Sequence, residues 1–250
     1  MCPSFSTPER QVPGLDRSSG LILVAVFTLT VFYYRLRTDT IGVTGGDGGL
    51  SAMTGPVLSF MQHNLAALVV LGLLPLAAAR WLCGLSLRDA GLGLGRWRPT
   101  LIWTAIGVPV ALLLGGLSAA DPVMRSVYPL EVGLKPAMPG FLAHMAGQLA
   151  FYLGWELLFR GVLLGGLTRR FGFAGANTIQ TALSVIAHFG RPLPETLAAI
   201  PAGLAFGGVA RRTGSIWPVV IIHLAAGAAQ DWFIVELFPI RPEIVIILSQ

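Results

Sequence analysis

The stretch Phe151–Arg170, FYLGWELLFRGVLLGGLTRR, carries two charged side chains in the middle of a long apolar run. Glu156 and Arg160 are four residues apart, so a helix places them on one face, where they can pair. A charged side chain at the centre of a bilayer costs roughly 2.5–3.5 kcal/mol on insertion scales. The stretch therefore predicts a membrane-spanning helix whose buried ion pair serves either helix packing or chemistry.

The composition of the whole chain is that of a membrane protein. Its 250 residues are 54% hydrophobic and only 12% charged, whereas soluble domains are about 25% charged. The mean hydropathy is +0.72. The net charge of +5 is spread over short loops, which indicates membrane topology and contact with anionic lipid in the bilayer, and not nucleic-acid binding.

Apolar segments predict an all-α, polytopic membrane bundle with about seven transmembrane helices, within a range of six to eight. The expected spans are residues 20–34, 62–81, 101–120, 141–168, 174–189, 196–210 and 216–238. Residues 1–18 are expected to form a disordered cytoplasmic tail, 19–139 the first three spans with their loops, 140–238 a core of four spans, and 239–250 a short tail. More arginines and lysines of the short loops fall on the side of the N-terminus, which predicts a cytoplasmic N-terminus.

Ionisable side chains inside the predicted spans gather in the C-terminal half of the chain. His188 ends the fifth span, and His223 lies deep in the seventh. Asp231 follows His223 by eight residues, near the same helix face, and is expected to orient His223 or to cap the site. His63 and His144 lie near span ends and are expected at membrane interfaces.

These positions predict one intramembrane site built around Glu156. A carboxylate that Arg160 keeps ionised can accept a proton from water, so Glu156 can act as a general base. His188 and His223 are expected to join it. Asn177 and Gln180 begin the fifth span and can supply hydrogen bonds to the same site.

The order of these residues resembles the CAAX-protease and bacteriocin-processing family of intramembrane glutamic endopeptidases, also called CPBP or Abi. The family motifs are Glu-Glu-x-x-x-Arg, Phe-x-x-x-His, and His-x-x-x-Asn or similar. Here they read WELLFR (residues 155–160), SVIAH (184–188) and HLAAG (223–227). Trp155 thus stands where the family has its first glutamate, and Gly227 stands where it has an amide.

The flanking sequence is similar to a branch of this family that has a single glutamate. The shared segments are GWE-x-x-FRG at 154–161, HFG-[KR]-P-x-PE-T at 188–196 and RTGSIWP at 212–218, followed by His223 and an aspartate eight residues later. Proteases of this branch are suspected of processing C-terminal sorting tails of bacterial surface proteins, a myxosortase-like activity. The resemblance covers about residues 140–235.

The resemblance implies an intramembrane endopeptidase of the bacterial cytoplasmic membrane. Its substrate would be a membrane-anchored protein or peptide, cut near the membrane boundary. The implied roles are that Glu156 activates water, His188 shares that water, His223 faces the carbonyl oxygen and Arg160 holds Glu156. Trp155, Asn177 and Gln180 are expected to line the substrate cavity, and one of these two amides, or water, would replace the amide missing at position 227.

Three alternatives remain open from the residues alone. No cofactor is expected, but Glu156, His188 and His223 could also bind zinc and activate water, although the chain has no HExxH motif. A non-catalytic scaffold that shares the fold is a second alternative. A small transporter is the third, and the lack of a convincing internal repeat counts against it.

Overall fold

The computed structural model describes residues 17–31, 56–130, 134, 135 and 137–238, and within this part of the chain it contains helices and no strand. This confirms the predicted all-α membrane bundle. The predicted tail up to residue 16, the glycine-rich loop before Pro56 and the tail from residue 239 lie outside the described residues.

Within the residues that the structure describes, five helical segments are long and apolar enough to cross a membrane, as an integral membrane protein requires. They are Phe60–Cys83, Trp97–Ala119, Met138–Ala187, Leu193–Thr213 and Trp217–Leu237. Helix α1 (Arg17–Val31) contains a shorter apolar stretch, Ser19–Leu29. The segment from Met138 to Ala187 has 50 residues and contains the fourth predicted span and all but the last two residues of the fifth.

The structure divides these segments into elements that are used below. They are α4 (Pro56–Ala67), η2 (Leu68–Leu73), α5 (Leu74–Cys83), α6 (Trp97–Ala119), α7 (Pro122–Arg125), α8 (Met138–Glu156), η3 (Leu157–Gly165), α9 (Gly166–Ala187), α10 (Leu193–Thr213) and α11 (Trp217–Leu237). The elements η2 and η3 are wider π-helical stretches inside longer helices. Such stretches often occur at functional sites, and η3 begins directly after Glu156.

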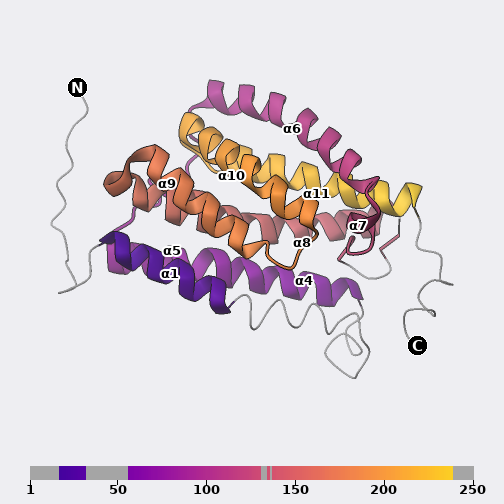
Figure 1. Cartoon of the computed structure of the whole chain (residues 1–250), viewed down its shortest axis with the longest axis horizontal. Coiled ribbons are helices and arrows are strands. Elements are labelled where there is room, and N and C mark those ends of the chain that lie inside the picture. Colours follow the sequence, from indigo (N-terminus) through magenta and orange to yellow (C-terminus); the bar gives the residue numbers. More distant parts are fainter. Residues whose placement is uncertain (1–16, 32–55, 131–133, 136, 239–250) are drawn as a thin grey trace.

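The 50-residue segment reverses its direction at Gly172. This glycine has φ 65° and ψ 174°, a conformation that residues with a Cβ rarely adopt. The rings of Trp155 and His188 lie 5.1 Å apart, whereas a straight α-helix would separate residues so far apart in sequence by about 50 Å. The turn lies near the beginning of α9, at the left of Figure 1, and therefore brings the end of α8 and the end of α9 together.

The helices pack side by side, with α6 along one edge of the bundle and α1, α4 and α5 along the opposite edge (Figure 1). Small residues let the backbones approach closely, as is common between membrane helices. A Cβ at Gly115 of α6 would overlap the carbonyl oxygen of Ala226 on α11. A Cβ at Gly154 would lie 2.8 Å from the Cα of Leu68, so the contact with η2 holds the α8 backbone two residues before Glu156.

Candidate active site

The carboxylate of Glu156 is completely buried at the end of α8. Nδ1 of His223, on α11, lies 2.7 Å from its Oε1. Nη1 of Arg160, one turn further along in η3, lies 3.1 Å from Oε2 and 3.3 Å from Oε1. Three helical elements therefore supply one charged cluster, and the structure brings Glu156, Arg160 and His223 together as the sequence predicts.

The two oxygens of Glu156 have different surroundings. Oε1 accepts hydrogen bonds from Arg160 and faces His223 Nδ1. Oε2 has the Arg160 charge beside it, but no donor among the described residues is aligned to hydrogen bond with it. Because a carboxylate only accepts, His223 carries its proton on Nδ1. Oε2 is therefore the oxygen with remaining capacity for a proton or a water molecule.

Aromatic rings enclose the His223 imidazole. Tyr152 stacks on it with 4.1 Å between ring centroids, and Phe206 of α10 lies 5.4 Å away. The Tyr152 hydroxyl lies beside Gly227, where an added Cβ would overlap it. Tyr152 is not among the predicted site residues, although it precedes Glu156 by four residues and so shares its helix face.

His188 is held on the other side of Trp155. Its Nδ1 lies 2.7 Å from the carbonyl oxygen of Ser184, which can only accept, so Nδ1 donates and Nε2 faces outward. Nε2 lies 3.9 Å from Oε1 of Glu195, in the first turn of α10. The hydroxyl of Tyr128 donates to Oε2 of that glutamate over 2.8 Å. The sequence analysis singled out neither of these two partners.

Trp155 is buried, and its indole packs edge-on against the His188 ring and beside Phe159. The side chains of His223, His188 and Glu195 are 25%, 16% and 22% exposed, whereas that of Glu156 is 0% exposed. The accessible edge of the cluster is therefore its histidine side, and the carboxylate lies behind it.

Asp231 lies in a different layer of the bundle from His223. Its Oδ2 is 2.9 Å from His144 Nε2 and accepts a hydrogen bond from Gln148 Nε2 over 2.5 Å, both on α8. Eight helical residues correspond to about 12 Å along the helix, which corrects the expectation that Asp231 orients His223. His144, which was expected at a membrane interface, has a completely buried side chain.

Asn177 and Gln180 bind α10 instead of Glu156. Asn177 Nδ2 donates to the carbonyl oxygen of Leu204 over 3.1 Å. Gln180 Nε2 lies within hydrogen-bonding distance of the Gly203 carbonyl oxygen, at 3.1 Å, and of Asn177 Oδ1, at 2.8 Å. These amides join α9 to α10, so the expected hydrogen bonds to the polar cluster are replaced by bonds between helices.

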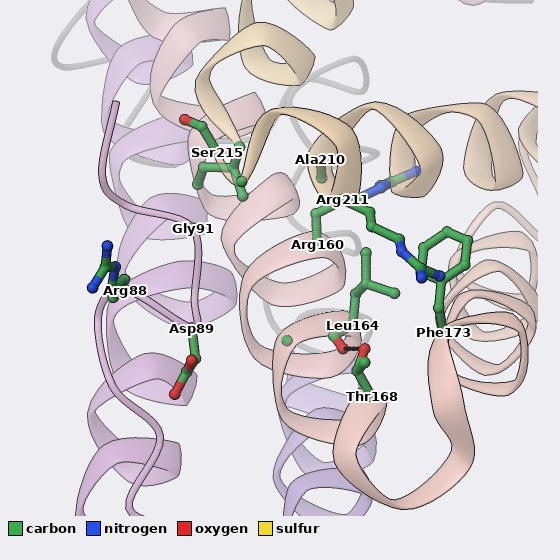
Figure 2. A pocket seen from close by; sticks show the side chains of 13 residues that line it. Arg88, Asp89, Gly91, Arg160, Leu164, Thr168, Phe173, Ala210, Arg211 and Ser215 are labelled. Carbon is green, nitrogen blue, oxygen red and sulfur yellow. Dashed lines mark hydrogen bonds between the residues drawn. The ribbon is translucent and has the colours of Figure 1, made fainter. Parts of the chain in front are cut away.

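A cavity of about 320 Å³ reaches the cluster from the side of Arg160. Figure 2 shows the loop residues Arg88, Asp89 and Gly91 along one wall and Leu164, Thr168 and Phe173 along the other. The Arg211 guanidinium lies over the Phe173 ring, 4.2 Å from its centroid. Arg160 therefore links this cavity, which basic residues surround, to the buried carboxylate.

The side chains that suit a metal ion do not converge. Among the described residues, no three His, Cys, Asp or Glu side chains are placed so that they could hold one. Glu156, His188 and His223 therefore do not fit the three-ligand set that a catalytic zinc needs, and no step below is routed through a metal.

Comparison with known proteins finds a family match over part of the chain. Residues 139–229 match the family described as Rce1-like, type II CAAX prenyl endopeptidase Rce1-like. The matched segment runs from α8 into α11 and includes Glu156, Arg160, His188 and His223. No curated protein and no solved structure matches the chain. Over this segment the chain is thus similar to a protease family of the kind that its motifs resemble.

Proposed function

We propose that the protein is an intramembrane endopeptidase that hydrolyses a peptide bond near the membrane boundary of a membrane-anchored protein or peptide. The observation that carries this proposal is the completely buried Glu156, held by Arg160 and His223 inside the segment that is similar to CAAX prenyl endopeptidases. The ion pair is part of a larger polar cluster, one edge of which is partly exposed. Here His223 contacts the pair, and His188 lies one indole ring away.

The arrangement suits water activation by Glu156. Arg160 and His223 both contact the carboxylate, and Oε2 can take a proton from water as the water oxygen bonds to the peptide carbonyl carbon. The carbonyl oxygen then takes the electron pair. An imidazolium at His223, with protons on both Nδ1 and Nε2, would donate its Nε2 hydrogen bond to that oxygen, so that its positive charge lies beside the oxyanion. The peptide C–N bond breaks when the carbonyl re-forms and the amine nitrogen receives a proton.

The same proposal places the protein in the bacterial cytoplasmic membrane with a cytoplasmic N-terminus. The support is the distribution of basic residues, several of which surround the cavity beside Arg160. Substrate and water would then meet the site from its histidine side, which is its more accessible edge.

A non-catalytic scaffold is the second candidate, and Trp155 favours it. An indole replaces a carboxylate at the position next to Glu156, and this indole is buried against Phe159. A scaffold would tolerate Glu156→Gln in complementation, whereas an endopeptidase would not.

The deciding experiment compares membrane proteomes of cells that lack the gene and carry wild-type protein, Glu156→Gln or Glu236→Gln. Glu236 is an exposed glutamate at the end of α11 and provides the matched control. We expect one membrane protein to show a new C-terminus with wild type and Glu236→Gln and to lose it with Glu156→Gln. Wild-type processing by Glu156→Gln would refute the proposal. Metal analysis of the purified protein and a cleavage assay in the presence of a chelator would show whether the activity depends on zinc.

A further inference from the structure

Glu195 and His188 are fixed next to each other by the turn between α9 and α10. Oε1 of Glu195 lies 3.9 Å from Nε2 of His188. The neighbouring Thr196 hydroxyl donates to the His188 carbonyl oxygen over 3.1 Å, and the Arg191 amide donates to the same oxygen over 2.9 Å. The backbone therefore sets the separation of the two side chains.

Tyr128, in the loop before α8, orients the Glu195 carboxylate. Its hydroxyl donates to Oε2 over 2.8 Å. Burial raises the pKa of the Tyr128 phenol well above its usual range, so the hydroxyl keeps its proton and remains a donor. With Oε2 bound in this way, Oε1 is the oxygen that faces His188.

The two atoms that face each other are both proton acceptors. His188 Nδ1 donates to Ser184, so Nε2 of the neutral ring carries the lone pair. A separation of 3.9 Å is too long for a direct hydrogen bond. It approaches the roughly 4–4.5 Å between two acceptors that one water molecule bridges. When His188 takes up a proton on Nε2, the same carboxylate becomes its counter-charge.

Glu195 and Trp155 both lie next to the His188 imidazole. The indole, at the position where a family glutamate is missing, packs against one side of the His188 imidazole. Glu195 approaches the same imidazole from α10. Glu195 of α10 thus supplies a carboxylate that the Trp155 position of α8 lacks. It belongs to the segment HFG-[KR]-P-x-PE-T, which the sequence shares with the single-glutamate branch.

We propose that Glu195 is the second carboxylate of the site, a positioning residue that holds His188 ready to carry a proton to the leaving amine. This inference rests on the proposed function. Glu156 takes one proton from water as the C–O bond forms. The His188 imidazolium gives its Nε2 proton to the amine nitrogen as the C–N bond breaks. The proton on Glu156 then returns to His188 through water, and both groups regain their starting states.

The first test measures cleavage of a peptide that spans the new C-terminus. Because general acid catalysis contributes about 10²–10⁴-fold, we expect Glu195→Gln to lower kcat about 10–100-fold with little change in KM. Glu195→Asp should restore part of the loss, and Glu236→Gln should have no effect. An ester analogue, whose leaving group needs little protonation, should be cleaved at similar rates by wild type and Glu195→Gln. An equal loss on peptide and ester would overturn the acid role.

The second test needs no substrate, so it separates this inference from the proposed function. The charged or titratable groups around His188 are Glu195 on α10, Arg191 in the turn, His223 on α11 and Arg160 on η3. Burial lowers the pKa of His188 to about 4. In ¹⁵N NMR of the histidine-labelled protein, Glu195→Gln should move the His188 titration midpoint to a still lower pH. Tyr128→Phe should move it less. An unchanged midpoint in Glu195→Gln would refute the pairing even if the protein cleaves its substrate, and a shifted midpoint without any cleavage would refute only the proposed function.

Discussion

Two layers of the α8–α11 contact use the same chemistry with the helices exchanged. In one layer, Glu156 of α8 meets His223 of α11. In the other, Asp231 of α11 meets His144 of α8. Both layers pair a carboxylate with an imidazole at hydrogen-bonding distance inside apolar helices. A search of the sequence for such pairs would rank them equally.

Their surroundings separate the two layers. The His144 side chain is fully buried, and its ring stacks on Phe60 with 4.6 Å between centroids. The Glu156 layer contains the guanidinium of Arg160, and a quarter of the His223 side chain is exposed. A polar pair closed on every side is suited to fixing helix register, whereas a charged pair with an accessible edge can exchange protons with a substrate. The exposed edge of the pair, and not the pairing itself, therefore distinguishes the candidate active site.

The largest contrast is expected from the two isosteric changes Glu156→Gln and Asp231→Asn. The first removes the proposed base, so cleavage should fall by about 10²–10⁴-fold while the protein still folds. The second replaces the Asp231 carboxylate with an amide of the same shape in the closed layer. The cleavage rate per folded molecule should therefore stay within a few-fold of wild type. Rates on purified, detergent-solubilised protein measure both. Equal losses in the two variants would abolish the distinction between the layers.

Removing the Arg160 charge should give the next largest effect, on stability. Arg160→Met leaves Glu156 buried without its cationic partner, and breaking a buried pair costs about 3–5 kcal/mol. Arg169→Met, at an exposed arginine of α9, is the control. Denaturation in detergent should also show that adding Glu156→Leu to Arg160→Met recovers much of the loss. Additive losses in the double variant would show that the two charges are not coupled.

A smaller loss of stability is expected in the closed layer. Asp231→Ala leaves His144 and Gln148 without their shared acceptor, and an unsatisfied buried polar group costs about 1–3 kcal/mol. Thermal unfolding should shift downward, while the folded fraction keeps its cleavage rate. A large loss of kcat at unchanged stability would instead bring Asp231 back into the catalytic site.

The smallest effect is expected at Gln180, which the sequence assigned to the substrate cavity. Gln180→Leu removes hydrogen bonds between α9 and α10, which in membrane proteins are worth about 0.6–1.7 kcal/mol. KM should remain at its wild-type value. A raised KM with unchanged thermal stability would support the cavity assignment over the packing role that the contacts favour.

Sequence reasoning located the carboxylate and its arginine because their spacing of four residues is a property of any helix. It identified His188 and His223 because histidines are unusual in apolar segments. It could not choose the partner of Asp231, since that choice depends on the register between α8 and α11, which neighbouring residues do not encode. The predicted sixth span began at Thr196, so Glu195 was assigned to a loop, although it lies in the first turn of α10.

Tyr128 and Tyr152 were missed for different physical reasons. Tyr128 reaches Glu195 from an irregular loop, and no periodic pattern reports where a loop passes. Tyr152 precedes Glu156 by the same four residues that separate Glu156 from Arg160. The helical spacing that predicts the ion pair therefore also places Tyr152, which stacks on His223, on the same helix face. Its aromatic ring was overlooked because an apolar helix is expected to contain such residues.

The reversal at Gly172 has a consequence for the order in which the chain is made. Glu156, Arg160 and His188 belong to one hairpin, so ribosomal synthesis delivers them to the membrane within a few dozen residues of one another. His223 arrives later, on α11. Until α11 inserts, the carboxylate lacks one of its two partners. The cluster of Glu156, Arg160 and His223 therefore forms only when α11 is in place beside α8.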